Sequence, residues 1–368
     1  MISLTIKENN FKELELVKLV NETNSGFERK PIIDLSRIHA LDTMRGYCVL
    51  MMIAWHYYFF LKVNYLETNF FIFWIMNVIV LPGNPMFIII MGTSLVLSLE
   101  RRKEKGNGFQ NNLFHLIKRA ILFFLVHHIM VISYLLYFGP MVFQLPNLYP
   151  GWIPALGINA IICFFLMYLR KIYRFFIMVG INLTSMFNLI PYIGLDFNSL
   201  FYMIFGTILG ELIVEAREND AILAFKKKML VTGIILFIVG IPCEVYINNT
   251  YDLSIPNPNV LNKPFFAVYS IGIFILIFSI LFWIQDCRNK KRISQPLTLF
   301  SSLSLTIFYF HYVLGTNFFM PFGFGNLFSL YSYVLFLVAF YIALYLICVL
   351  WARAKNKYSL EWIVRRFS

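Results

Sequence analysis

Long apolar runs separated by short basic segments constrain this chain more than any other feature of its sequence. Ten of the runs are long enough to cross a lipid bilayer, which takes about 20 residues in a helix. They cover residues 44–63, 71–99, 119–138, 153–169, 175–193, 199–215, 229–247, 264–284, 296–316 and 327–351. Because backbone polar groups must be satisfied inside lipid, these runs predict an all-α, polytopic membrane bundle of about ten transmembrane helices.

The basic residues fall between the runs and follow one side of the predicted membrane. With the N-terminus in the cytoplasm, all but two of the 31 Lys and Arg residues lie on the cytoplasmic side. The exceptions are Lys62 and Lys263. Since cytoplasmic loops carry an excess of Lys and Arg, this pattern predicts that both termini are cytoplasmic.

Composition supports an integral membrane protein and excludes two other classes. Hydrophobic residues make up 59% of the chain and charged residues 14%, which is too little charge for a soluble globular domain. The net charge of +12 is divided among short loops, so it indicates membrane orientation and no nucleic-acid partner. The expected location is a membrane that the chain crosses many times, which in a prokaryotic cell is the plasma membrane.

The first run has an arginine near its start and a histidine eleven residues later. At about 100° per residue, eleven steps make three turns plus roughly 20°, and they rise about 16 Å along the axis. Arg45 and His56 therefore share one face of the helix, with Arg45 at the membrane edge and His56 near the middle. A titratable side chain at that depth is costly and indicates a functional site.

Further polar side chains lie within other apolar runs. His127 and His128 lie midway along the third run and point about 100° apart, so at most one of them faces a shared cavity. His311 lies in the outer half of the ninth run, and Glu244 closes the seventh. An interhelical hydrogen bond explains a single histidine of this kind, but four of the six histidines within the membrane favour chemistry.

Two segments near helix starts add to the pattern. Asp42 is a suitable N-cap for the first helix, and Arg45 three residues later can pair with it. In the second run, the Pro-Gly-Asn-Pro segment at residues 82–85 predicts a break or kink. Lipid tolerates such a break only where protein or a cavity satisfies the freed backbone groups, although an ordinary hairpin loop is equally compatible with the segment.

Four motifs, in chain order, resemble those of the transmembrane acyltransferase superfamily. They are Leu41-Asp42-x-x-Arg45-Gly46, Phe-Ile-Ile-Ile-Met-Gly-Thr-Ser at 87–94, Ser-Leu-Thr-Ile-Phe-Tyr-Phe-His at 304–311 and Ser-Leu-Glu-Trp-Ile-Val-Arg-Arg at 359–366. The second and fourth are similar to motifs of the heparan-α-glucosaminide N-acetyltransferase and YeiB-like branch. The spacing of Arg45 and His56 is instead similar to that of acyltransferase-3 enzymes, which are sugar O-acyltransferases. N-acylation and O-acylation therefore both stay open.

The resemblance implies a donor, an acceptor and a division of the chain. The donor is acyl-CoA from the cytoplasm, with acetyl-CoA the first expectation, and the acceptor is an amine or hydroxyl of a sugar or glycan at the outer face. Residues 1–36 are expected to form a polar cytoplasmic extension and residues 37–368 the transmembrane acyltransferase-like domain. The expected partners are the lipid bilayer and the glycan acceptor, and a homo-oligomer stays open.

The resemblance also assigns roles to individual residues. The phosphates of CoA are expected among Arg45, Arg37 and Arg119, with Asp42 beside them. His56 is expected to act as general base or transient acyl carrier, while His311 orients the acceptor or serves as the base itself. Acceptor binding is assigned to three further residues, which are Ser304, His128 and Glu244.

The residues leave other functions open as well. Intramembrane His and Glu can form a proton relay and a broken helix is typical of some transporters, so a multi-span transporter or flippase is the alternative. A scaffold or sensor that keeps the fold without activity is a third reading. The five cysteines form no CxxC pair, and no metal is expected.

Overall fold

The described part of the chain is entirely helical. The computed structural model describes residues 37–61, 75–138, 152–186, 197–250, 264–288, 295–319, 322, 324 and 328–367. Within these ranges every regular element is a helix and none is a strand, which confirms the predicted all-α class. The extension predicted over residues 1–36 lies outside the described residues, so the division into an extension and a membrane domain stays a prediction.

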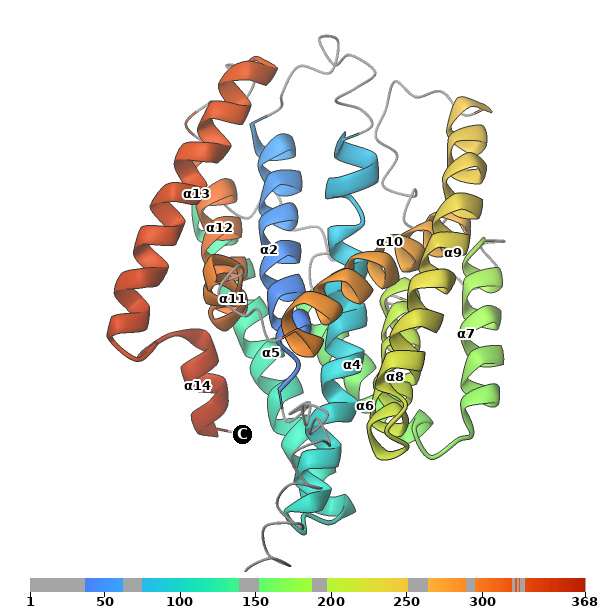
Figure 1. Ribbon diagram of the computed structural model, residues 1–368. Coiled ribbons are helices and arrows are strands. Elements are labelled where there is room, and N and C mark those ends of the chain that lie inside the picture. Colours follow the sequence, from blue (N-terminus) through green and yellow to red (C-terminus); the bar gives the residue numbers. More distant parts are fainter. Residues whose placement is uncertain are drawn as a thin grey trace, which may run out of the picture. The chain divides into compact units, whose positions relative to one another are not determined.

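The helices follow the order of the predicted runs and are labelled in Figure 1. They are α2 (His39–Phe60), η2 (Ile75–Val80), α4 (Gly83–Glu104), α5 (Phe109–Phe138), α6 (Trp152–Leu166), α7 (Lys171–Met186), α8 (Phe197–Glu218), α9 (Ile222–Thr250), α10 (Pro264–Phe282), η6 (Trp283–Cys287), α11 (Gln295–Ser302), α12 (Ser304–Leu314), η8 (Gly315–Phe319), α13 (Leu330–Arg353) and α14 (Leu360–Phe367). Each predicted run falls on one or more of these helices.

Several helices have the length and composition of membrane spans. Among the described residues five helices qualify, and a bent pair raises the number to six. The five are Gly83–Glu104, Phe109–Ile129, Asn198–Glu218, Phe266–Cys287 and Leu330–Arg353. The molecule is therefore a polytopic membrane bundle, while the count of ten spans and the side of each terminus stay predictions.

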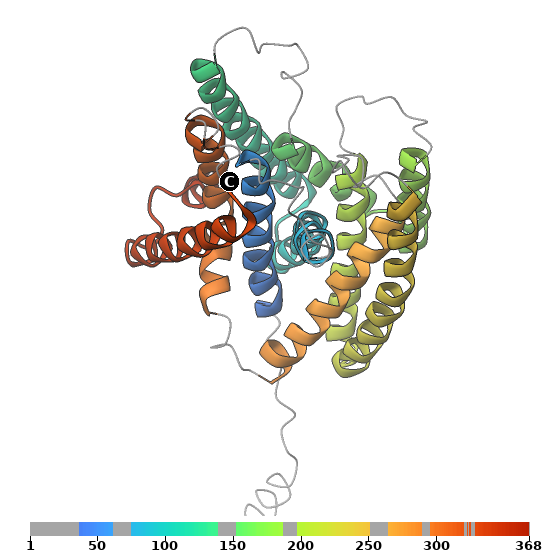
Figure 2. The same ribbon diagram turned by 90° about the horizontal axis from the view of Figure 1, so that it is seen from above.

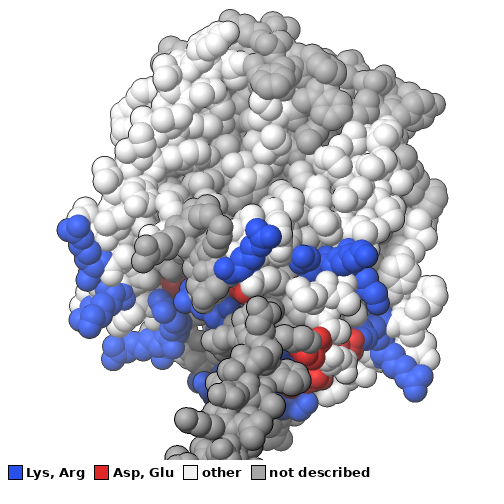
Figure 3. Space-filling model, viewed as in Figure 1, with Lys and Arg blue, Asp and Glu red and all other residues white. Residues whose placement is uncertain are grey.

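Basic side chains gather at one level of this bundle. On the described surface visible in Figure 3, Lys and Arg form a belt, and the surface on one side of the belt shows none. The last turn of α4 contributes Arg101, Arg102 and Lys103, and the last turns of α8 and α13 contribute Arg217 and Arg353. We call the end of the bundle with these three last turns the basic end. Such a belt is typical of the cytoplasmic membrane surface.

The central helix α4 lies between α2 and α8, as Figures 1 and 2 both show. Glycines bring α4 and α8 into backbone contact. A Cβ atom on Gly92 would lie 2.3 Å from the carbonyl oxygen of Met203, and one on Gly206 would lie 2.2 Å from that of Ile89. Small residues permit this close approach in membrane bundles, and the contact fixes α4 against its neighbour.

The break predicted in the second run is present. The π-helical segment η2 ends at Val80, and α4 begins at Gly83 after a turn. At this point a Cβ atom on Gly83 would lie 2.7 Å from the Cβ atom of Met51 on α2. The break therefore packs directly against the first helix.

The ninth run differs from the single span that its sequence suggests. Helices α11 and α12 meet at an angle of 76°, and Leu303 between them has φ −123° and ψ 23°, outside the helical region. The first amide groups of α12 are satisfied by the carboxylate of Glu361, which accepts from the N–H of Leu305 and of Thr306. A helix can restart inside the bundle because this distant side chain caps it.

Candidate active site

The two histidines predicted to be catalytic lie side by side. His56 is on α2 and His311 is on α12, and Nδ1 of His56 lies 2.8 Å from Nε2 of His311. Their rings are nearly parallel, with 9° between the planes and 5.1 Å between the centroids. The structure thus joins two residues that the sequence predicts only separately.

The surroundings of His311 fix the direction of the hydrogen bonds in this pair. Nδ1 of His311 lies 2.9 Å from the carbonyl oxygen of Ile307, which can only accept, so the proton of His311 is on Nδ1. In the neutral ring Nε2 is then an acceptor, and Nδ1–H of His56 donates to it. The free lone pair of the two rings is therefore on Nε2 of His56. This nitrogen is the proton acceptor at the end of the chain of hydrogen bonds.

Aromatic side chains hold the two imidazoles in place. The ring of His56 stacks on Phe60, with 5.9 Å between the centroids, and meets Tyr312 edge to face at 5.8 Å. The hydroxyl of Tyr57 donates to the carbonyl oxygen of His311 at 3.2 Å. The orientation of both rings is thus set by α2 and α12 together.

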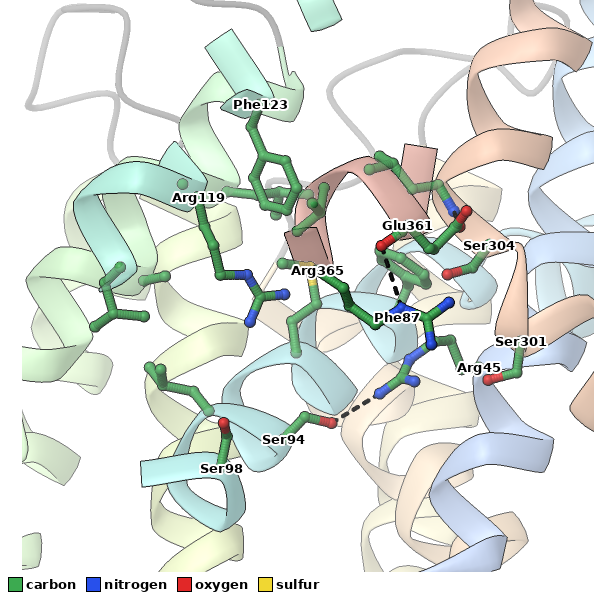
Figure 4. Close-up of a pocket in the computed structure, with 18 of the residues that line it drawn as sticks. Arg45, Phe87, Ser94, Ser98, Arg119, Phe123, Ser301, Ser304, Glu361 and Arg365 are labelled. Carbon is green, nitrogen blue, oxygen red and sulfur yellow. Dashed lines mark hydrogen bonds between the residues drawn. The ribbon is translucent and has the colours of Figure 1, made fainter. Parts of the chain in front are cut away.

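A cavity of about 520 Å³ lies among α2, α4, α5, α6, α11, α12 and α14. Its size is in the range of small-molecule sites. Polar and charged residues line it alongside apolar ones, and Figure 4 shows several of them. They are Arg37, Asp42, Arg45, Ser94, Ser98, His115, Arg119, Ser301, Ser302, Ser304, Asn356, Glu361 and Arg365.

Hydrogen bonds hold the guanidinium group of Arg45 at one side of this cavity. Its Nη2 donates to Oγ of Ser94 on α4 at 2.9 Å, and its Nη1 donates to Oδ1 of Asp42 at 3.5 Å. The other carboxylate oxygen of Asp42 accepts from Nε of Arg37 at 2.7 Å. The pairing of Arg45 with Asp42, predicted from their spacing, is confirmed, and Asp42 holds both arginines at the cavity.

The prediction that Asp42 caps the first helix is wrong. Helix α2 begins at His39, three residues earlier, so Asp42 lies in its first turn. The cap comes from Asp286 of η6, whose carboxylate accepts from the N–H of His39 at 2.8 Å and of Ala40 at 3.0 Å. Because Asp286 takes over the capping, the carboxylate of Asp42 is available to the two arginines.

The cavity has more positive than negative charge. Within the described residues Arg119 forms neither a hydrogen bond nor an ion pair, and Arg365 pairs with no carboxylate. The carboxylate of Glu361 is occupied by α12, and that of Asp42 serves two arginines. Figure 4 shows Arg45, Arg119 and Arg365 reaching into the same space from three elements. Clustered guanidinium groups of this kind bind phosphate or carboxylate.

Phe308 connects the cavity with the histidine pair. Its side chain lines the cavity, and its ring centroid lies 6.2 Å from that of His56 and 5.4 Å from that of His311. The two histidines themselves are not among the residues that line the cavity. Arg45 lines the cavity and His56 does not, and the ring of Phe308 borders both the cavity and the histidine pair.

The three residues assigned to acceptor binding are scattered. Ser304 lines the cavity together with Arg45. His128 is half-buried on α5, where its ring nitrogen Nδ1 lies 2.8 Å from the carbonyl oxygen of Phe124, and it does not line the cavity. Glu244 is on α9, and its side chain lies outside the described residues. The structure does not bring the three together, and their roles stay predictions.

Sequence reasoning assigned no role to Phe308, Ser94, Glu361 or Arg365. Phe308 is one of 40 phenylalanines, so its identity alone gave no signal. Glu361 and Arg365 are four residues apart in the C-terminal motif, a spacing that places both on one helix face. That spacing was the available signal, although the contact of Glu361 with α12 depends on the tertiary fold.

Metal chemistry has no candidate site in the part of the chain that the structure describes. No group of three or more His, Cys, Asp or Glu side chains is arranged there to hold a metal ion. The expectation of no metal stays a prediction.

Comparison with known proteins identifies the family. No curated protein matches the chain. A family model described as an acyltransferase domain matches residues 38–353, which include Arg45, His56 and His311. The match supports the resemblance at the level of membrane acyltransferases and does not distinguish the glucosaminide branch from others. With most of its length matched, the chain belongs to the acyltransferase-domain family, as a membrane-embedded member.

Proposed function

We propose that the protein transfers an acyl group, with acetyl the first candidate, from cytoplasmic acyl-CoA to an amine or hydroxyl of a sugar or glycan at the opposite membrane face. One observation carries the proposal: the oriented chain from Ile307 through His311 to His56 lies next to a cavity with excess positive charge. The base and the anion site match the two ends of an acyl-CoA molecule, which are the thioester and the phosphates.

The donor is expected to bind with its phosphates among Arg45, Arg37 and Arg119, which all line the cavity. Guanidinium groups bind phosphate oxygens through paired N–H donors, and an under-neutralised cluster of them attracts a polyanion. Apolar side chains, among them Phe87 and Phe123, line the same cavity and suit the less polar arm of the donor. The thioester reaches Nε2 of His56 by passing the ring of Phe308.

The chemistry is general base catalysis at Nε2 of His56. As the acceptor oxygen or nitrogen attacks the thioester carbonyl, its proton moves to Nε2 of His56. The new bond joins the acceptor to the acyl carbon, and the bond between that carbon and sulfur breaks. The imidazolium then returns its proton to the departing sulfur, so no net charge stays on the protein. His311 stabilises the imidazolium of His56 by accepting from its Nδ1–H.

The proposed acceptor class is supported by the resemblance to sugar acyltransferases and by the position of the base. His56 follows the cavity-lining Arg45 by eleven residues on α2, and we propose that an acceptor from the other membrane face meets the thioester there. A sugar or glycan is the proposed acceptor. The choice between amine and hydroxyl depends on the acceptor, because a neutral imidazole serves both.

Acyl transfer from a labelled donor tests this function directly. Purified protein is reconstituted into lipid vesicles and given acetyl-CoA labelled in the acetyl group, with glucosamine as an acceptor that offers both an amine and hydroxyls. We expect label on the sugar with the wild-type protein and at least 100-fold less, on the order of general base catalysis, with His56→Ala. Release of the label by hydroxylamine distinguishes an ester from an amide.

The vesicles also separate the outcomes. Label on an enclosed sugar from an external donor supports transfer across the membrane, whereas label only on sugar mixed with the donor contradicts it. Full transfer by folded His56→Ala would remove that residue from the mechanism. No transfer by the wild-type protein to any of a panel of hexoses and hexosamines would contradict the sugar acceptor.

A further inference from the structure

The C-terminal helix α14 lies beyond the family match and yet belongs to the cavity. The match ends at residue 353, whereas α14 spans Leu360–Phe367. Glu361, Val364 and Arg365 of this helix line the cavity, together with Asn356 of the turn before it. One wall of the cavity is thus built by a segment that the acyltransferase-domain match does not include.

The path of the chain into α14 is fixed by its own contacts. The turn that follows α13 contains Lys355, Asn356 and Tyr358, all with positive φ, between 55° and 63°. The indole N–H of Trp351 donates to the carbonyl oxygen of Lys357 at 2.8 Å. Oγ of Ser359 accepts from the N–H of Trp362 at 3.1 Å and so caps the new helix. These contacts within the turn therefore fix the position at which α14 begins.

Hydrogen bonds in both directions attach α14 to α12. The carboxylate of Glu361 accepts from the backbone N–H of Thr306 at 3.1 Å, and also from the N–H of Leu305 and the hydroxyl of Thr306. In return the N–H of Leu360 donates to Oγ1 of Thr306 at 2.9 Å. Since α12 contains His311, the same contact joins the cavity wall to the helix of the histidine pair.

The two arginines at the end of α14 face different ways. Arg365 lies four residues after Glu361, on the side that lines the cavity, and Figure 4 shows it beside Arg45 and Arg119. Arg366 does not line the cavity; its guanidinium lies over the ring of Trp362, 5.2 Å from the centroid. Both arginines are exposed on the same helix, so a substitution of Arg366 is a suitable control for the same substitution of Arg365.

We propose that α14 is part of the donor site, and that Arg365 binds a phosphate group of the acyl-CoA at the cavity. This inference rests on the proposed function, because it takes acyl-CoA as the donor. The exposed position of Arg365 places it where the cavity meets solvent, and Arg45 and Arg119 lie deeper as half-buried residues. A phosphate that enters from solvent can contact Arg365 and be shared among the three guanidinium groups.

Binding of CoA to the full-length protein in lipid nanodiscs tests the proposal. Isothermal titration calorimetry compares the wild type with Arg365→Gln and with the matched control Arg366→Gln. Loss of a hydrogen-bonded charge contact predicts that Arg365→Gln binds CoA about tenfold more weakly. Arg366→Gln, which changes the net charge equally, is expected to bind within about twofold of the wild type, since an exposed charge at a distance is screened by salt.

The possible results are distinguishable. Wild-type affinity in Arg365→Gln, with CoA bound by the wild type, overturns the role of α14 and leaves the proposed function standing. Equal losses in both variants overturn it as well, because they indicate attraction by overall charge. Failure of the wild type to bind CoA overturns the proposed donor and with it this inference. The thermal unfolding of each variant, measured in parallel, verifies that the helix remains folded.

Discussion

Two arginines near the membrane boundary have opposite surroundings. Arg174 of α7 is 1% exposed, and its guanidinium pairs with the carboxylate of Glu211 and donates to Oγ1 of Thr207 at 3.2 Å, both on α8. Arg45 of α2 shares one carboxylate, that of Asp42, with a second arginine and lines an open cavity. Arg174 is enclosed, whereas Arg45 faces a space that a ligand can fill.

The balance of charge distinguishes the two regions more clearly than the residue type. On α7 and α8, Arg174 pairs with Glu211 and Lys171 pairs with Glu215, so every cation there has its own carboxylate. Around the cavity, four arginines meet two carboxylates, one of which is occupied by backbone amides. A cation with its own carboxylate partner joins one helix to another, whereas a cluster of cations with too few carboxylates attracts an anionic ligand. The comparison predicts that substitutions at Arg174 lower the free energy of unfolding, whereas substitutions at the cavity and the histidine pair lower enzymatic activity.

The largest expected effect is at the histidine pair. We expect His56→Ala to lower kcat about 1000-fold, because it removes the base, while thermal stability changes little. Since His56 and His311 act as one hydrogen-bonded chain, the variant with both replaced by Ala should be no slower than His56→Ala alone. Turnover of labelled acetyl-CoA measures both. Losses that multiply in the double variant would show that the two residues act independently.

The next effect concerns stability at the paired arginine. Arg174→Met leaves Glu211 without its partner, and we expect a loss of about 3 kcal/mol in unfolding free energy. Adding Glu211→Leu should restore most of it, because no buried charge is then left unpaired. Thermal unfolding in detergent gives the stabilities, and kcat below the transition should match the wild type. Reduced kcat in the folded variant would extend the functional region to α7.

A smaller effect is expected from replacing Arg45 by Lys. Lysine keeps the charge but loses the fork that reaches both Ser94 and Asp42, so donor KM should rise about tenfold. Unfolding free energy should change by less than about 1 kcal/mol, because lysine keeps the positive charge beside Asp42. The same replacement at Arg174 should lower stability and leave donor KM unchanged. If both replacements act on stability alone, the distinction between the two regions is lost.

Features that depend on local spacing were predictable from the sequence. The helices follow from runs of apolar residues, and the pairing of Arg45 with Asp42 follows from their separation by three positions. Arg45 and His56 share one face of α2 because eleven residues of regular helix separate them. Each of these depends on residues within a few turns of one another.

Features that depend on distant contacts were not predictable. Asp286 caps α2 from 247 residues away, and Glu361 caps α12 across 55 residues. The bend at Leu303 depends on that second cap. The sequence of the ninth run alone therefore suggested a single span. No spacing rule in a single sequence reveals which carboxylate meets which helix end.

The smallest expected effect is at His128, and it tests whether depth in the membrane alone makes a histidine functional. His128 lies in an apolar run as His56 does, but its ring stacks on Phe124 with 3.9 Å between centroids, and its Nδ1 faces the carbonyl oxygen of that residue. We expect His128→Ala to keep kcat and donor KM within about twofold, since a half-buried side chain with local partners contributes little. The measurement is the same labelled-donor assay. A loss comparable to that of His56→Ala in a folded variant would give α5 a part in acceptor binding. A wild-type result would instead support chemistry at His56 and His311, whose hydrogen bond joins two helices.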